Sequence, residues 1–104
     1  MKFMVKYTIT DQDKFLSVAR KWSSMSPQER AQEPGEGVTK IGGWHDLSGR
    51  HGVVIIESND TAAVGRWVGR WNPYLDIEVS AVVDDEEVAA IGRLVVMDAD
   101  QTLR

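Results

Sequence analysis

The chain has 104 residues and a mass of 11.6 kDa, which is the size of one compact domain with one core and excludes a two-domain enzyme. It carries 12 Lys and Arg against 16 Asp and Glu, a formal net charge of −4. This balance disfavours nucleic acid as a partner, because phosphate binding usually needs a basic face. The absence of cysteine excludes disulfides, thiolate nucleophiles and cysteine-ligated metal centres.

The apolar segments are far shorter than the roughly 20 residues that span a bilayer. Lys6 interrupts the apolar start of the chain, which argues against a signal peptide. We therefore expect a soluble, cytoplasmic protein with no membrane partner.

The first part of the chain predicts a strand, a helix and a polar loop. Residues 3–9 alternate between apolar and polar side chains, as in a strand with one apolar face. Residues 10–11 are good helix caps. The apolar face of the helix that follows them consists of Phe15, Val18, Ala19 and Trp22. Residues 26–30 predict a further capped turn, and residues 33–37 form a polar loop.

Residues 38–46 and 52–57 predict two strands joined by a turn-rich connector of hairpin length. Residues 53–56 are apolar without alternation, so the second of these strands should be central and covered on both faces. Residues 58–60 can cap a second helix. Its apolar face consists of Val64, Trp67, Val68 and Trp71.

The last part of the chain predicts a strand at residues 75–83 and a short helix. The helix begins at the acidic run of residues 84–87, because carboxylates stabilise the positive end of a helix dipole. We interpret this run as a helix start and expect no metal site there. Residues 97–104 are predicted to form a flexible C-terminal tail.

This order of elements is typical of an α+β, ferredoxin-like βαββαβ fold with an extra C-terminal helix. Such a fold has a four-stranded antiparallel sheet with both connecting helices on one face. We expect a single domain over residues 1–96. The helix-free face would leave part of residues 53–56 in water, so we expect a homodimer that buries this face.

Four Trp residues in so short a chain are its most informative feature. Trp67 and Trp71 lie four residues apart, so they share a helix face that is directed at the sheet, and Trp44 lies near the end of an adjoining strand. Two interpretations stay open. The rings form an aromatic core, or they wall a pocket between the second long helix and the sheet.

His45 is the best candidate for proton transfer, because histidine titrates near neutral pH. Glu57 lies on the neighbouring strand and could orient a ligand together with His45. His51 and Asp46 add too little for a metal site, which usually takes three or four protein ligands. We therefore expect no metal and no cofactor.

Several motifs together resemble a known family. They are Met1–Tyr7 as an opening strand, Gly43-Trp44-His45-Asp46, Gly49 with Gly52, Glu57-Ser58-Asn59-Asp60, and Trp67 with Trp71. Over residues 1–83 the chain resembles a bacterial family of short proteins with a domain of unknown function, within the dimeric α/β-barrel, ferredoxin-like superfamily. The resemblance implies a fold and a dimer, but no established reaction.

The wider superfamily includes cofactor-free antibiotic-biosynthesis monooxygenases and haem-degrading enzymes, which hold ligands between helices and sheet. The chain departs from the haem-degrading members, because Lys6, Tyr7 and Thr8 stand where those members have an Asn on the first strand.

Three hypotheses of function follow. The leading one is a small homodimeric protein that binds a planar or hydrophobic ligand in a pocket of Trp44, Trp67 and Trp71, with His45 and Glu57 as polar contacts. The alternative is a cofactor-independent monooxygenase or isomerase that uses His45 as acid or base on an aromatic substrate. The third is an interaction module whose working surface is the bare sheet face. The sequence leaves open whether the protein is an enzyme.

Overall fold

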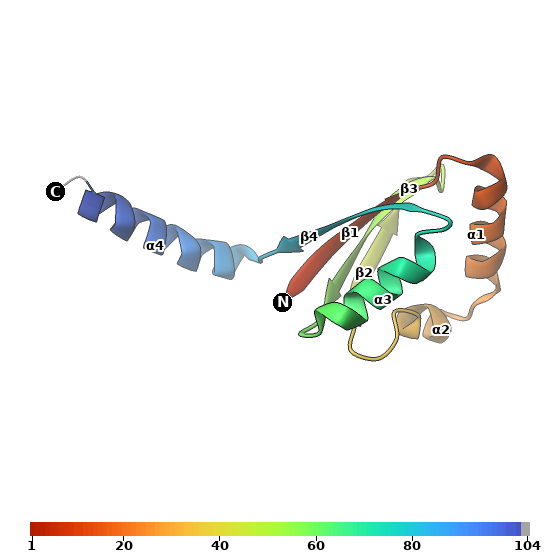
Figure 1. The fold of residues 1–104 in the computed structure, drawn as a ribbon, viewed down its shortest axis with the longest axis horizontal. Coiled ribbons are helices and arrows are strands. Elements are labelled where there is room, and N and C mark those ends of the chain that lie inside the picture. Colours follow the sequence, from red (N-terminus) through yellow and green to blue (C-terminus); the bar gives the residue numbers. More distant parts are fainter. Residues whose placement is uncertain (103–104) are drawn as a thin grey trace.

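Residues 1–102 are described by a computed structural model. They form one four-stranded sheet and four helices (Figure 1). In chain order the elements are β1 (Lys2–Thr8), α1 (Gln12–Ser24), α2 (Pro27–Gln32), β2 (Thr39–His45), β3 (His51–Glu57), α3 (Thr61–Trp71), β4 (Asp76–Val82) and α4 (Asp85–Thr102).

The strands lie in the order β2-β3-β1-β4, and every neighbouring pair is antiparallel. With α1 and α3 as the long connections, this is the predicted ferredoxin-like α+β arrangement, followed by an additional helix. β3 is internal, as its uninterrupted apolar run indicated. The fold class is therefore confirmed.

The register separates the side chains of the sheet into two faces, because directly paired residues of antiparallel strands point the same way. On one face, Val5 of β1 lies between Val54 of β3 and Val79 of β4. This face meets the helices, and the core cluster there consists of Val5, Ile56, Val64, Trp67 and Trp71. We call the opposite side the open face. Its apolar side chains are Met4, Trp44, Val53, Ile55 and Val82.

The helices begin where local chemistry favours a helix start. The Asp11 carboxylate accepts a hydrogen bond from the N–H of Asp13 at 2.8 Å, and that of Asp60 from the N–H of Ala63 at 3.2 Å. Ser26 forms a reciprocal capping box with the third residue of α2. These bonds satisfy backbone donors that a helix leaves unpaired.

α4 is longer than the short helix that we expected. It starts at the acidic run, where Asp84 and Glu87 cap it reciprocally through N–H···O bonds of 2.8 and 3.2 Å. It has 18 residues, so the predicted tail of residues 97–104 is helical as far as Thr102, and residues 103–104 lie outside the described part. Beyond Gly92 the chain has no glycine or proline, so nothing local ends the helix.

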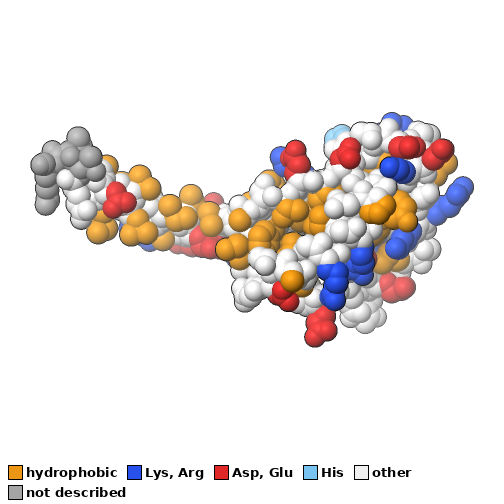
Figure 2. Space-filling view, viewed as in Figure 1, with side chains coloured by type: hydrophobic (Ala, Val, Ile, Leu, Met, Phe, Trp, Pro, Cys, Tyr) orange, Lys and Arg blue, Asp and Glu red, His pale blue; other side chains and the backbone are white. Residues whose placement is uncertain are grey.

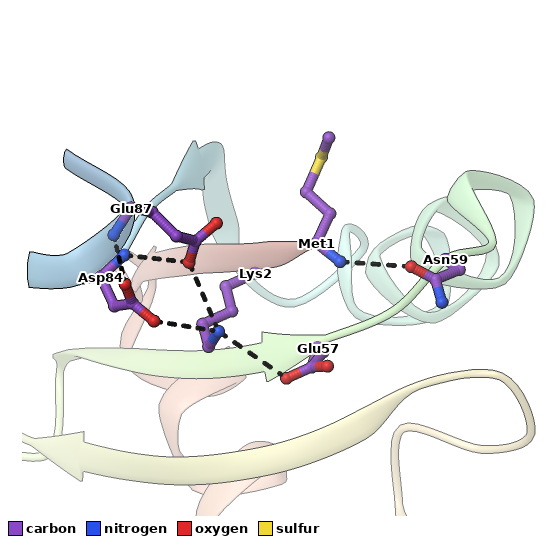
Figure 3. A network of polar contacts seen from close by, with 6 residues as sticks. All are labelled: Met1, Lys2, Glu57, Asn59, Asp84 and Glu87. Atoms are coloured by element: carbon purple, nitrogen blue, oxygen red, sulfur yellow. Dashed lines mark hydrogen bonds and ion pairs between the residues drawn. The ribbon is translucent and has the colours of Figure 1, made fainter. Parts of the chain in front are cut away.

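A cluster of charges anchors the start of α4 to the sheet (Figure 3). The Lys2 ammonium lies 3.6 Å from Glu87, 3.7 Å from Asp84 and 4.0 Å from Glu57. Beyond this cluster α4 extends away from the body (Figure 1) and carries hydrophobic side chains along its length (Figure 2). Six of these, between 45% and 60% exposed, are Val88, Ile91, Leu94, Val95, Val96 and Met97.

We predict that a second copy of the chain covers the open face. Met4, Val53 and Ile55 are only half-buried there, and Trp44 is 61% exposed, which is a large apolar surface for a monomer. Sedimentation equilibrium at micromolar concentration should give twice the chain mass of 11.6 kDa. Ile55→Glu should yield the monomer with an unchanged circular dichroism spectrum.

The matched control is Leu16→Glu, which places the same charge on the exposed side of α1 and should leave the dimer intact. A single 11.6 kDa species for the unmodified chain would contradict this prediction.

Candidate functional site

A cavity of about 370 Å³ lies between the sheet and helices α1, α2 and α3. Most of its wall is apolar, and β1, β3, β4, α1 and α3 all contribute to it. Its aliphatic part consists of Val5, Ile9, Val18, Ala19, Pro34, Val54, Val68, Leu75 and Ile77. Its aromatic part consists of Tyr7, Phe15, Trp22, Trp67 and Trp71.

The rings of α3 belong to the core and to the cavity at once. Trp67 and Trp71 are only 6% and 8% exposed and belong to the core cluster, yet both line the cavity. Trp22 of α1 meets Trp71 edge to face, with ring centroids 6.4 Å apart and an interplanar angle of 71°. The aromatic core and the aromatic pocket therefore use the same side chains.

A carboxylate fixes both rings of α3. Glu33, in the loop after α2, accepts a hydrogen bond from the indole N–H of Trp67 on one oxygen and from that of Trp71 on the other, each at 2.7 Å. Arg70 adds bonds to the carbonyls of Glu33 and Pro34, at 3.1 and 3.3 Å. Bonds to a charged acceptor are stronger than neutral ones, so this loop and α3 hold each other in place.

Polar side chains gather at another part of the wall. The Tyr7 hydroxyl and His45 Nδ1 share a hydrogen bond of 2.5 Å. The two residues lie on either side of Gly52, to which both are paired in the sheet. A Cβ at Gly52 would lie 2.9 Å from the Tyr7 ring and 3.0 Å from His45 Nδ1. The pair therefore depends on glycine at this position.

Lys40 adjoins this pair. Its Nζ and the Nε2 of His45 each lie 3.6 Å from the point that a Cβ on Gly43 would occupy, and the Lys40 charge acts on the His45 imidazole. The ammonium also lies 4.9 Å from the ring centroid of Trp22, within the range of a cation–π contact.

Burial and charge shift the titration of these groups. Burial lowers the pKa of His45, and the Lys40 charge lowers it further, so the imidazole is neutral at pH 7 and can accept a proton. Burial also lowers the pKa of Lys40, against the opposing effect of Glu33, and Arg30 lowers it further. The pKa of Tyr7 is raised by burial, which keeps the phenol protonated.

A β-bulge brings Lys40 and His45 to the same face. Lys40 pairs with Ile56 and Gly42 with Ile55, which leaves Ile41 as an extra residue in β2. In a regular strand, side chains five positions apart point to opposite faces. The extra residue reverses this alternation, so both side chains reach the cavity.

The structure places the predicted site residues on both faces of the sheet. His45, Trp67 and Trp71 line the cavity, whereas Trp44 and Glu57 do not. Trp44 pairs with Val53 and therefore lies on the open face. Glu57 also lies there, opposite Lys2 in the register.

Among the other residues of the wall are five with aromatic or ionisable side chains, and the sequence interpretation did not assign them to the site. They are Tyr7, Trp22, Arg30, Glu33 and Lys40. Tyr7 and Trp22 stand on the predicted apolar faces of their elements, which could have indicated them. Glu33 and Lys40 have no comparable signal in the local sequence. Glu33 is positioned by a loop and Lys40 by a bulged strand.

Two negative findings hold for residues 1–102. No group of three or more His, Asp or Glu side chains is arranged there to hold a metal ion. No helix of this part of the chain has the length and apolar character that a membrane crossing requires.

We predict that Glu33 stabilises the fold through its two indole partners. Glu33→Ala leaves two largely buried N–H donors without an acceptor, so we expect the free energy of unfolding to fall by about 2 kcal/mol. Glu33→Gln keeps one acceptor oxygen and should lose about half as much. Urea denaturation followed by circular dichroism measures both.

Glu36→Ala serves as the control, because Glu36 lies exposed in the same loop, and it should change stability by less than about 0.5 kcal/mol. Equal unfolding midpoints for Glu33→Ala and Glu36→Ala would show that the indole bonds do not stabilise the fold.

Comparisons with known proteins agree with the motifs but give no activity. No curated protein matches the sequence. Among solved structures, the chain is similar to a crystal structure described as a "putative antibiotic biosynthesis monooxygenase" from Deinococcus radiodurans, with 11% identity and a TM-score of 0.43 over 81% of this chain and 94% of that one. The sequence model of the family described as Domain of unknown function (DUF3303) matches residues 1–96, and the chain belongs to this family.

Proposed function

We propose that the protein binds a planar, hydrophobic small molecule in the cavity between the sheet and the helices. The observation that carries this proposal is the cavity itself. Its volume of about 370 Å³ falls in the range of about 300–1,000 Å³ that is typical of ligand pockets. Its apolar wall with a few polar groups is the usual composition of such pockets.

The aromatic wall supports a flat ligand. Trp22 and Trp71 meet edge to face, and Glu33 holds the rings of Trp67 and Trp71 from the side of their N–H groups. Rings held in this way lose little further freedom when a ligand binds, which favours affinity. The Tyr7–His45 pair then provides polar groups that can orient the ligand.

We predict saturable binding of flat aromatic compounds in this cavity. A panel of quinones, flavonoids and indoles should contain members that quench the Trp fluorescence with a saturable dose response. Ala19→Phe fills part of the cavity from α1 and should weaken binding at least tenfold, because a ligand must then displace the new ring.

Leu16→Phe is the matched control, since it adds the same ring on the exposed side of the same helix and should bind like the unmodified protein. Unchanged emission with every member of the panel would favour a purely structural aromatic core.

One observation favours an enzyme as a second candidate. His45 is neutral, hydrogen-bonded to Tyr7 at 2.5 Å and on the cavity wall, which is the arrangement of a general base whose ring a partner orients. A cofactor-independent monooxygenase or isomerase of aromatic substrates would use this base to remove a proton from a C–H or O–H group of the bound compound.

We predict that His45 matters for proton transfer and little for stability. His45→Ala should keep the melting temperature within a few degrees of the unmodified protein, because the residue is partly exposed. If the site acts as a base, it accelerates exchange of the acidic C–H protons of 2-tetralone in D₂O, as followed by NMR. His45→Ala should reduce this acceleration about 100-fold, the usual contribution of a general base.

Tyr7→Phe keeps the imidazole but removes the hydroxyl that orients it, and it should give an intermediate rate. An unfolded His45→Ala variant would make the histidine structural, and an unchanged exchange rate would exclude it as the base.

A further inference from the structure

The charges of the ionisable groups on the cavity wall do not sum to zero. Arg30 and Lys40 are cations, Glu33 is an anion, and His45 and Tyr7 are neutral at pH 7. The wall therefore has one positive charge in excess. An excess charge beside an apolar cavity is costly, because burial weakens its hydration.

Two of the three charged groups already have partners in the protein. Both carboxylate oxygens of Glu33 accept indole N–H groups. The Arg30 guanidinium donates to the carbonyl oxygens of Trp22, at 3.3 Å, and of Met25, near the end of α1. Both oxygens of Glu33 are therefore hydrogen-bonded, and the Arg30 guanidinium is held at the end of α1.

Lys40 is different. Within residues 1–102, its ammonium group forms no hydrogen bond and no salt bridge, and its contact is with the face of Trp22 at 4.9 Å. All three of its donors remain available. His45, which is hydrogen-bonded to Tyr7, lies beside it on β2, and the charges of Glu33 and Arg30 also act on it. The Lys40 ammonium group therefore places a positive charge without a hydrogen-bond acceptor on the cavity wall, next to His45 and Tyr7.

We infer that the cavity selects monoanionic aromatic ligands, with the planar body against the Trp rings and an anionic oxygen, such as that of a carboxylate or an enolate, on Lys40. This assignment rests on the proposed function and adds the charge of the ligand to it. The anion would neutralise the excess positive charge of the wall and accept a charge-assisted hydrogen bond from the ammonium group. His45 and Tyr7 would lie beside the same oxygen.

A matched pair of probes tests the assignment. 2-Naphthoate and 2-naphthamide have the same ring system and nearly the same shape, and they differ in charge. Titrations at pH 7 that follow Trp fluorescence should show at least tenfold tighter binding of the naphthoate. In Lys40→Met this preference should disappear, whereas Lys14→Met, which removes the same charge from an exposed position of α1, should keep it.

The outcomes separate the two proposals. Equal affinities of the two probes for the unmodified protein would overturn the charge preference and leave the proposed function intact. Binding of neither probe would overturn both. A preference that persists in Lys40→Met would overturn the role of Lys40. If Lys40→Met does not fold, as judged by circular dichroism, Lys40→Gln keeps a polar end without the charge and answers the same question.

Discussion

The period of two in a β-strand would place Lys40 and His45 on opposite faces of the sheet, and the bulge at Ile41 removes this restriction. Because of that one extra residue, the Lys40 ammonium group and the His45 imidazole both lie on the wall of the same cavity. The shift also turns Trp44 outward. This register places Lys40 and His45 in the cavity, and the other ionisable groups of the wall are Tyr7, Arg30 and Glu33.

Glu33 complements the bulge from the other side of the cavity. Its carboxylate ties the loop after α2 to two turns of α3, so the rings that would hold a ligand are in place before any ligand arrives. In these bonds each oxygen of Glu33, the acidic residue of the cavity wall, accepts one indole N–H group. No salt bridge joins Glu33 to Lys40 within residues 1–102, although the Glu33 charge opposes the fall in the pKa of Lys40 that burial causes.

The two faces of the sheet have different chemistry, although the same strands form them. The face toward the helices carries paired apolar residues. It also carries Tyr7 and His45, which are hydrogen-bonded to each other and both pair with Gly52. On the open face, Trp44 is exposed and Val53 and Ile55 are half-buried. The Lys2 cluster anchors α4, which extends from the body with its hydrophobic side chains exposed. Trp44 and His45 are adjacent in β2, and Trp44 lies on the open face whereas His45 lies on the cavity wall.

Local sequence patterns determined the element order, the helix starts and the paired rings of α3. Each depends on neighbours in the chain, such as a capping Asp60 or an i, i+4 pair at Trp67 and Trp71. The long α4 was underestimated because the acidic run marks a start, whereas nothing in the sequence marks its end. Only the tertiary structure decided that Lys40 faces the cavity, that Trp44 does not, and that Glu33 meets the indoles. These positions depend on the pairing of β2 with β3 at the bulge and on the bonds of Glu33 to indoles 34 and 38 positions away, and neither leaves a periodic signal in the sequence.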